Sequence, residues 1–121
     1  MRDGHSTWQD ALPTYVQQHG SHATMLVIVY PRNVEDPVLE ALRLAEVEGY
    51  TVSNGWHGIG NSGPVLGSTT WPGENAVILT AVSQEQSVRL VDMIRAIHDQ
   101  RRAVLPGTGM SIFAFPCTQL L

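Results

Sequence analysis

The chain has 121 residues, a hydrophobic fraction of 43% and a formal net charge of −4, which suits one domain with an ordinary core and leaves no room for a second. Its positive side chains are all arginine, and it contains no lysine. This excludes Schiff-base chemistry and a P-loop lysine, and the acidic balance argues against a nucleic-acid surface. Any phosphate would be bound by backbone N–H groups and arginine.

The cellular location follows from cysteine content and apolar runs. Cys117 is the single cysteine, so no intramolecular disulfide can form, and the N-terminal residues lack the apolar core of a signal peptide. The longest apolar run, residues 25–30, is far shorter than the roughly 20 residues that cross a bilayer. We expect a cytoplasmic protein.

The first half of the chain predicts an extension, a strand and a helix. Residues 1–22 are polar, and we expect a partly flexible N-terminal extension before a domain over residues 23–121. Residues 23–31 form a β-branched apolar run that predicts a central strand. Asp36-Pro37 predicts the cap and first position of a helix that ends at Gly49.

A second strand and a long loop follow. Residues 50–57 predict the strand, with a bulge at Asn54-Gly55. Residues 58–73 carry five glycines and two prolines without periodicity. They predict an irregular loop, and loops of this length inside a compact domain are usually functional.

The last part of the chain predicts strand, helix and strand. Residues 75–82 form a buried strand, and Ser83 with Gln86 predicts a capping box for the next helix. We expect the buried face of that helix to consist of Val88, Val91, Met93, Ile94 and Ile97. Residues 101–109 predict a loop, and residues 110–115 a strand that stops at Pro116.

The order of these elements is βαββαβ. It predicts an α+β, ferredoxin-like fold, in which two helices cover one face of a four-stranded antiparallel sheet. The other sheet face would be apolar and uncovered, so we expect the protein to associate.

Two glycine segments are the candidate ligand sites. Gly107-Thr108-Gly109 allows successive N–H groups to point at one anion, and Arg101 and Arg102 lie just before it. Gly58-Ile59-Gly60-Asn61 stands at the base of the long loop. Taken alone, each segment is more typical of a plain tight turn than of a ligand site. In an oligomer the two could meet in one cleft between subunits.

Catalytic and metal-binding patterns are missing from the sequence. His57 and His98 have no neighbouring nucleophile or carboxylate arrangement, and we expect His98 on the water-facing side of its helix. The histidines and Cys117 lack ligand spacing. The expectation is a binding protein without catalytic residues, metal or resident cofactor.

The order of elements and the two glycine segments resemble the PII signalling family and its PII-like relatives over residues 24–115. Residues 37–42 resemble that family's first helix, and Gly58-Ile59-Gly60 resembles the glycine pair at the base of its mobile T-loop. Gly107-Thr108-Gly109, followed by residues 112–115, resembles its B-loop Gly-Asp-Gly and final strand.

The resemblance implies a homotrimer that binds an adenine nucleotide in each intersubunit cleft and changes its T-loop to control a transporter or an enzyme. By position it implies these nucleotide-binding residues: Thr51, Gly58, Ile59, Gly60, Asn61, Thr80, Ala81, Arg101, Arg102, Gly107, Thr108 and Gly109.

The sequence departs from the family in ways that affect the ligand. The loop lacks the tyrosine that becomes modified, Met110 or Ser111 replaces a phosphate-binding lysine, and residues 116–121 hold no arginine. Losing these charge-assisted contacts weakens triphosphate binding most, so ADP or AMP is expected rather than ATP. The pattern suits the divergent PII-like group, which includes a carboxysome-associated branch linked to bicarbonate.

Two other functions remain open at this stage. A trimer of the copper-tolerance family would share the architecture and bind metal instead of nucleotide. A small ferredoxin-like enzyme would need His57 to face an enclosed pocket beside an acidic residue.

Overall fold

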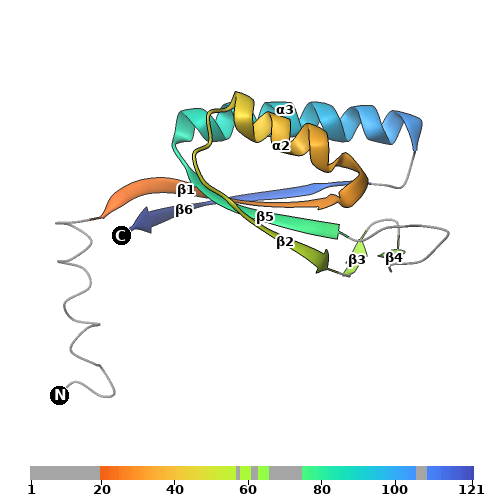
Figure 1. The fold of residues 1–121 in the computed structure, drawn as a ribbon, viewed down its shortest axis with the longest axis horizontal. Coiled ribbons are helices and arrows are strands. Elements are labelled where there is room, and N and C mark those ends of the chain that lie inside the picture. Colours follow the sequence, from red (N-terminus) through yellow and green to blue (C-terminus); the bar gives the residue numbers. More distant parts are fainter. Residues whose placement is uncertain (1–19, 57, 61–62, 66–74, 106–108) are drawn as a thin grey trace, which may run out of the picture.

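The computed structural model describes residues 20–56, 58–60, 63–65, 75–105 and 109–121. Two helices pack on one face of a four-stranded antiparallel sheet with strand order β2-β5-β1-β6 (Figure 1). This confirms the predicted ferredoxin-like fold. The strands are β1 Ser21–Pro31, β2 Thr51–Trp56, β5 Asn75–Val82 and β6 Ser111–Gln119, and the helices are the short 3₁₀ turn η1 Arg32–Val34, α2 Glu35–Leu44 and α3 Gln84–Val104.

The core lies between the sheet and the helices. In β1 the alternate residues Leu26, Ile28 and Tyr30 have no exposed surface, as expected for the side chains of one strand face. The register places Ile78 of β5 opposite Ile28 on the same face. The helices close this layer with buried apolar side chains, which are Val38, Ala41 and Leu42 of α2 and Leu90 and Ile94 of α3.

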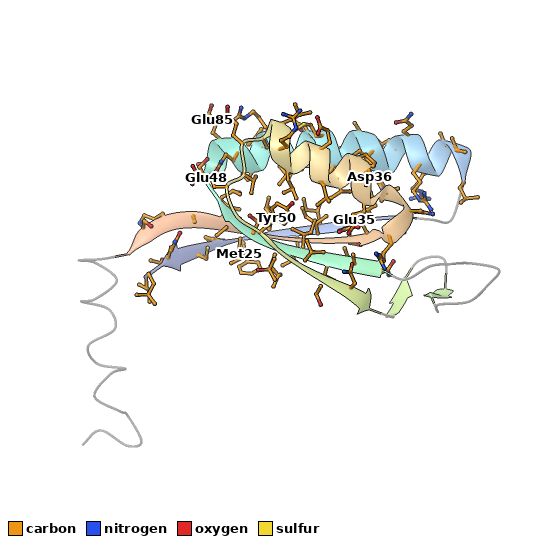
Figure 2. The ribbon with its side chains drawn as sticks, viewed as in Figure 1. Met25, Glu35, Asp36, Glu48, Tyr50 and Glu85 are labelled. Carbon is orange, nitrogen blue, oxygen red and sulfur yellow. The ribbon has the colours of Figure 1, made fainter. Side chains whose placement is uncertain are left out.

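The opposite face of the sheet is apolar and uncovered in the single chain. Met25 points away from the helices (Figure 2) and pairs with Phe115, and the next open-face pair joins Val27 to Phe113. Phe113 and Phe115 are 57% and 48% exposed, and Leu79 of β5 is 45% exposed. We call Met25, Val27, Val29, Val77, Leu79, Phe113 and Phe115 the open face.

The first helix differs from its prediction at both ends. Its N-cap is Val34, which makes no side-chain cap hydrogen bond, so the predicted cap at Asp36 is wrong. The helix ends at Leu44 instead of continuing to Gly49. Glu46 takes up a left-handed φ of 61° and reverses the chain, a role that normally falls to glycine. The sequence does not predict a left-handed residue here, because glutamate favours helix interiors.

The second helix confirms its predicted start and extends past its predicted end. The Ser83 Oγ accepts from the Gln86 N–H at 3.1 Å, and the Gln86 side chain accepts from the Ser83 N–H at 2.9 Å. The helix continues to Val104, so residues 101–104 are helical and the loop prediction is wrong there. Val88 is 56% exposed, which corrects its predicted burial. None of the described helices is long and apolar enough to cross a membrane.

The strands at the ends of the domain are longer than predicted. β1 begins at Ser21, and β6 runs through Pro116 to Gln119, with Pro116 opposite Thr24. The predicted stop at Pro116 is wrong because β6 is an edge strand, where a residue without an N–H can be tolerated. Residues 1–19 lie outside the described residues, so the division at residue 22 stays a prediction.

The segment after β2 contains regular structure where an irregular loop was predicted. β3 Gly58–Gly60 pairs antiparallel with β4 Gly63–Val65, with Gly60 opposite Gly63. Glycine has little preference for strands and shows no side-chain periodicity, so the pattern gave no signal for this pairing. The predicted bulge in β2 is confirmed by a register shift between Ser53 and Trp56.

Candidate functional site

The described residues of the two predicted glycine segments, Gly58–Gly60 and Gly109, lie at one end of the sheet. β2 runs antiparallel to β5, β5 to β1 and β1 to β6. The last residues of β2 therefore share an end with the first residues of β6 (Figure 1). Gly58–Gly60 follows β2, and Gly109 stands just before β6. The topology thus brings the segments to the same end.

The segments belong to opposite edges of that end. β2 and β6 are the edge strands, and β5 and β1 stand between them. Three strand spacings amount to about 14 Å. One phosphate group cannot bridge the β2 edge and the β6 edge of the same chain across that distance. A site built from both segments requires the edge of a second chain.

The arginines lie at the same end, in the last turn of α3. Arg102 is exposed, whereas Arg101 is half-buried, and its Nε–H is buried with no acceptor among the described residues. Arg101 continues the spacing of three and four residues set by Ser87, Leu90 and Ile94, the buried stripe of α3. Its orientation toward the sheet follows from that spacing. A buried donor of this kind normally has an acceptor.

The other predicted contacts lie nearer the opposite end of the sheet. Thr51 begins β2 and stands opposite Leu79, about 17 Å along the strand from Trp56. Thr80 is 3% exposed on the helix side, and its hydroxyl donates to the Gly49 carbonyl at 2.7 Å. Ala81 is exposed on the face away from the helices. Within one chain these residues do not join the glycine segments.

Some predicted site residues have no described placement. Asn61, Gly107 and Thr108 lie outside the described residues, as does His57. Gly109 is described, and its φ lies outside the left-handed region. Space is nevertheless tight here: a Cβ would stand 3.3 Å from His98 Cε1, so the imidazole would have to move by a few tenths of an ångström.

His98 is the residue that the sequence reasoning misplaced. It was expected on the water-facing side of α3, but it is half-buried, and its Nδ1 accepts from the Met110 N–H at 3.1 Å. His98 lies four residues after the buried Ile94, and this spacing indicates the sheet-facing side of the helix. His98 therefore joins α3 to the start of β6.

A buried hydroxyl holds the start of α2 near this end of the sheet. Tyr30, the last but one residue of β1, donates to Glu35 Oε1 at 2.8 Å. Burial of the ring raises the pKa of the Tyr30 hydroxyl well above its ordinary value, and the hydrogen bond to Glu35 raises it further. The pair is a structural link between β1 and α2.

A groove of about 410 Å³ lies along α2, on the helix side of the molecule. It is lined by Asp36, Leu39, Glu40, Arg43, Val47 and Tyr50. The one guanidinium in this lining is Arg43, and its Nε donates to Glu40 at 2.9 Å. The carboxylate of Asp36, which also lines the groove, would repel a phosphate. None of the predicted site residues lines the groove. The glycine end of the sheet is the better candidate.

Fold and site together define a ferredoxin-like α+β domain whose glycine segments gather at one end of the sheet and whose open face is uncovered in the single chain. The sequence profile of the family "Nitrogen regulatory protein P-II" matches residues 23–120. The chain belongs to this family, which confirms the resemblance. No curated protein matches the chain.

Solved structures of PII-like proteins share the fold. CPII from Thiomonas intermedia K12, a nitrogen regulatory PII-like protein in a structure with ADP, AMP and bicarbonate, is similar with a TM-score of 0.71 and 17% identity over 84% of this chain and 92% of that one. The apo form of CPII gives a TM-score of 0.63 and 15% identity over 83% and 94%. A PII-like signalling protein from Thermus thermophilus gives 0.59 and 18% over 84% and 93%.

Proposed function

We propose that this protein is a PII-like regulatory trimer that binds ADP or AMP between subunits and uses the segment over residues 58–73 to control a partner. The nucleotide lies between the Gly107–Gly109 segment of one subunit and the Gly58–Asn61 segment of the next. Thr51, Thr80 and Ala81 line or support the cleft from the neighbouring strands. Arg101 and Arg102 stand beside the phosphates.

The observation that supports this proposal most is the placement of the two glycine segments. They share an end of the sheet but occupy opposite edges, and the open face between those edges is apolar and exposed in the single chain. Burying the open face against other copies would bring the β2 edge of one subunit toward the β6 edge of another. The Nε–H of Arg101, which has no acceptor among the described residues, supplies a donor at the same end.

The choice of ADP or AMP follows from charge. The chain has no lysine, and the described residues 109–121 contain no arginine, so few cations are available for a third phosphate. Structures of CPII contain ADP, AMP and bicarbonate. A small anion such as bicarbonate is therefore proposed as a second ligand beside the nucleotide.

Isothermal titration calorimetry with AMP, ADP and ATP, each with and without bicarbonate, tests the proposal. AMP and ADP should bind roughly tenfold or more tightly than ATP, because missing charge-assisted hydrogen bonds cost the triphosphate most. Bicarbonate should increase the affinity for at least one nucleotide. If neither AMP nor ADP binds up to millimolar concentration, the nucleotide proposal is wrong.

The signalling step is proposed to involve residues 58–73. A ligand that contacts Gly58–Gly60 acts on the start of the β3–β4 pair, and a change there alters the surface shown to a transporter or an enzyme. Hydrogen exchange across residues 58–73, measured with and without ADP, tests this step. Equal exchange in the two states, with binding demonstrated, would show that the segment is not the switch.

The two alternatives have separate tests. Among the described residues there is no group of three or more histidine, cysteine, aspartate or glutamate side chains that could hold a metal ion, so the copper-binding alternative has no site in that part of the chain. Titration with copper under the same conditions distinguishes it from the sensor. The enzyme alternative depends on His57, which lies outside the described residues. A cytoplasmic location, with the carboxysome-associated branch as an option, stays a prediction.

A further inference from the structure

A side-chain hydrogen bond joins α3 to the start of β6. His98 Nδ1 accepts from the Met110 N–H at 3.1 Å. The β6 ladder with β1 ends at Ser111, opposite Val29, so Met110 lies just beyond it. The Met110 side chain packs against the core. Met110 is therefore fixed both through its backbone and through its side chain, immediately after the glycine segment.

The hydrogen bond determines the state of the imidazole. The Met110 N–H is the donor, so Nδ1 is the acceptor, and a ring nitrogen that accepts a hydrogen bond carries no proton itself. The ring is half-buried on α3, which packs on the sheet. It acts as an acceptor on a rigid helix, directed at a backbone N–H that would otherwise lack a partner in the β1–β6 ladder.

Gly109 lies close to the imidazole ring of His98. A Cβ at position 109 would stand 3.3 Å from His98 Cε1 and 3.9 Å from His98 Nδ1, and the shorter distance is closer than ordinary carbon contacts. The φ of Gly109 is outside the left-handed region, so backbone strain does not explain the glycine. The imidazole occupies the space that a side chain at 109 would need.

We infer that His98 is a positioning residue for the nucleotide site, since it fixes Gly109 and Met110 where the chain enters β6. This inference rests on the proposed function. Backbone N–H groups bind an anion only when their directions converge, and a small displacement of the chain loses that convergence. Nothing in the family resemblance assigns a role to this histidine.

The test compares three variants of the full-length protein. His98→Leu removes the acceptor, whereas His98→Asn keeps an oxygen on the γ carbon, close to the position of Nδ1. Gln100→Leu, an exposed change on the same helix, is the control. We expect His98→Leu to weaken ADP and AMP binding roughly tenfold, as loss of one positioning hydrogen bond does, and His98→Asn and Gln100→Leu to remain within about twofold of wild type.

Two readouts are independent of nucleotide. Hydrogen exchange of the Met110 amide should be slow in the wild type and in His98→Asn and faster in His98→Leu. ¹⁵N NMR of the imidazole should show an unprotonated Nδ1. A protonated Nδ1, or a Met110 amide that exchanges equally in all variants, overturns the inference.

The outcomes separate this inference from the proposed function. A wild-type protein that binds neither AMP nor ADP overturns the nucleotide proposal. Wild-type binding with unchanged affinity in His98→Leu overturns the role of His98 alone. Gly109→Ala adds a second check, because it should weaken binding when His98 is present and cost less in a His98→Ala background, where the ring no longer occupies the space.

Discussion

At the scale of single residues, the left-handed Glu46 is a site of local strain. Its φ of 61° ends α2, where the Val47 N–H donates to the Leu42 carbonyl and the Glu46 N–H to the Arg43 carbonyl, both at 3.0 Å. The hydrogen bonds are those of a Schellman cap, which most often has glycine at this position. The energy gained from the cap outweighs the left-handed penalty of about 1 to 2 kcal/mol.

Glu46→Gly is therefore expected to stabilise the protein. Removing the Cβ relieves the left-handed penalty, and the greater freedom of glycine in the unfolded state offsets part of the gain, leaving about 0.5 to 1 kcal/mol. Gln86 donates to the Glu46 carbonyl at 2.8 Å, a backbone contact that glycine keeps. Urea unfolding at fixed protein concentration measures the change. Glu48→Gly, at an exposed position without positive φ, should destabilise, and a gain in both variants would refute the explanation.

The raised pKa of Tyr30 predicts how the free energy of unfolding changes at alkaline pH. The folded state holds the Tyr30 proton more tightly than the unfolded state, because burial and Glu35 raise its pKa. The stabilisation is complete below the ordinary tyrosine pKa of about 10 and is lost as pH rises toward the higher folded value. The chain has no lysine, so few other groups titrate in this range.

Tyr30→Phe should cost about 1 to 2 kcal/mol at pH 7, where the hydrogen bond to a carboxylate is lost. Between pH 9 and 11, the free energy of unfolding of the Tyr30→Phe variant should fall less than that of the wild type. Tyr50→Phe, a change at an exposed tyrosine, should follow the wild type. Urea midpoints across this pH range provide the measurement, and parallel curves for wild type and Tyr30→Phe would contradict the assignment.

At the scale of elements, α3 depends on its capping box and α2 does not have one. Ser83 and Gln86 satisfy each other's backbone N–H groups, whereas the N-cap of α2 makes no side-chain hydrogen bond. Helix α2 is instead held by its packing and by the link from Tyr30 to Glu35. The N-termini of α2 and α3 are thus stabilised by different interactions.

Ser83→Ala should lower the free energy of unfolding by about 1 kcal/mol, the usual cost of an N-cap. Ser83→Asp should retain most of the stability, because its carboxylate also accepts from the first turn and interacts well with the helix dipole. Gln84→Ala, at an exposed position of the same turn, is the control. Thermal and urea unfolding check the order, and equal losses in the alanine and aspartate variants would exclude a capping effect.

At the scale of the whole molecule, the open face predicts association, and under the proposed function the assembly is a trimer. The exposed side chains of Leu79, Phe113 and Phe115 lie on one sheet face, and contiguous apolar surface of this kind is normally buried by association. Light scattering should give about three times the chain mass of 13.2 kDa.

Leu79→Asp should dissociate the trimer and abolish nucleotide binding together, because the proposed cleft needs two chains and a charge is costly to bury there. Val88→Asp is the matched control, since Val88 is a similarly exposed apolar residue on α3, away from the sheet. It should keep both mass and binding. A wild-type protein with the mass of one chain, or a Leu79→Asp variant that remains trimeric, would contradict this account.

Three features were predictable from the sequence. They are the order of elements, the sheet with helices on one face and an apolar surface on the other, and the cap at Ser83. Each is a local property: strand and helix periodicity, turn residues and capping residues act over a few neighbouring positions. The open face was also predictable, because the alternate residues 25, 27 and 29 and 77, 79 and 81 are all apolar.

Tertiary structure alone decided the features that depend on contacts between distant parts of the chain. Two such features override local preference. The left-handed Glu46 has its carbonyl bound by Gln86 of the other helix, and β6 continues through Pro116 because it pairs with β1 at the edge of the sheet. The hydrogen bond from Met110 to His98 joins two elements and leaves no local pattern. The tight space at position 109 likewise exists because α3 brings an imidazole beside it.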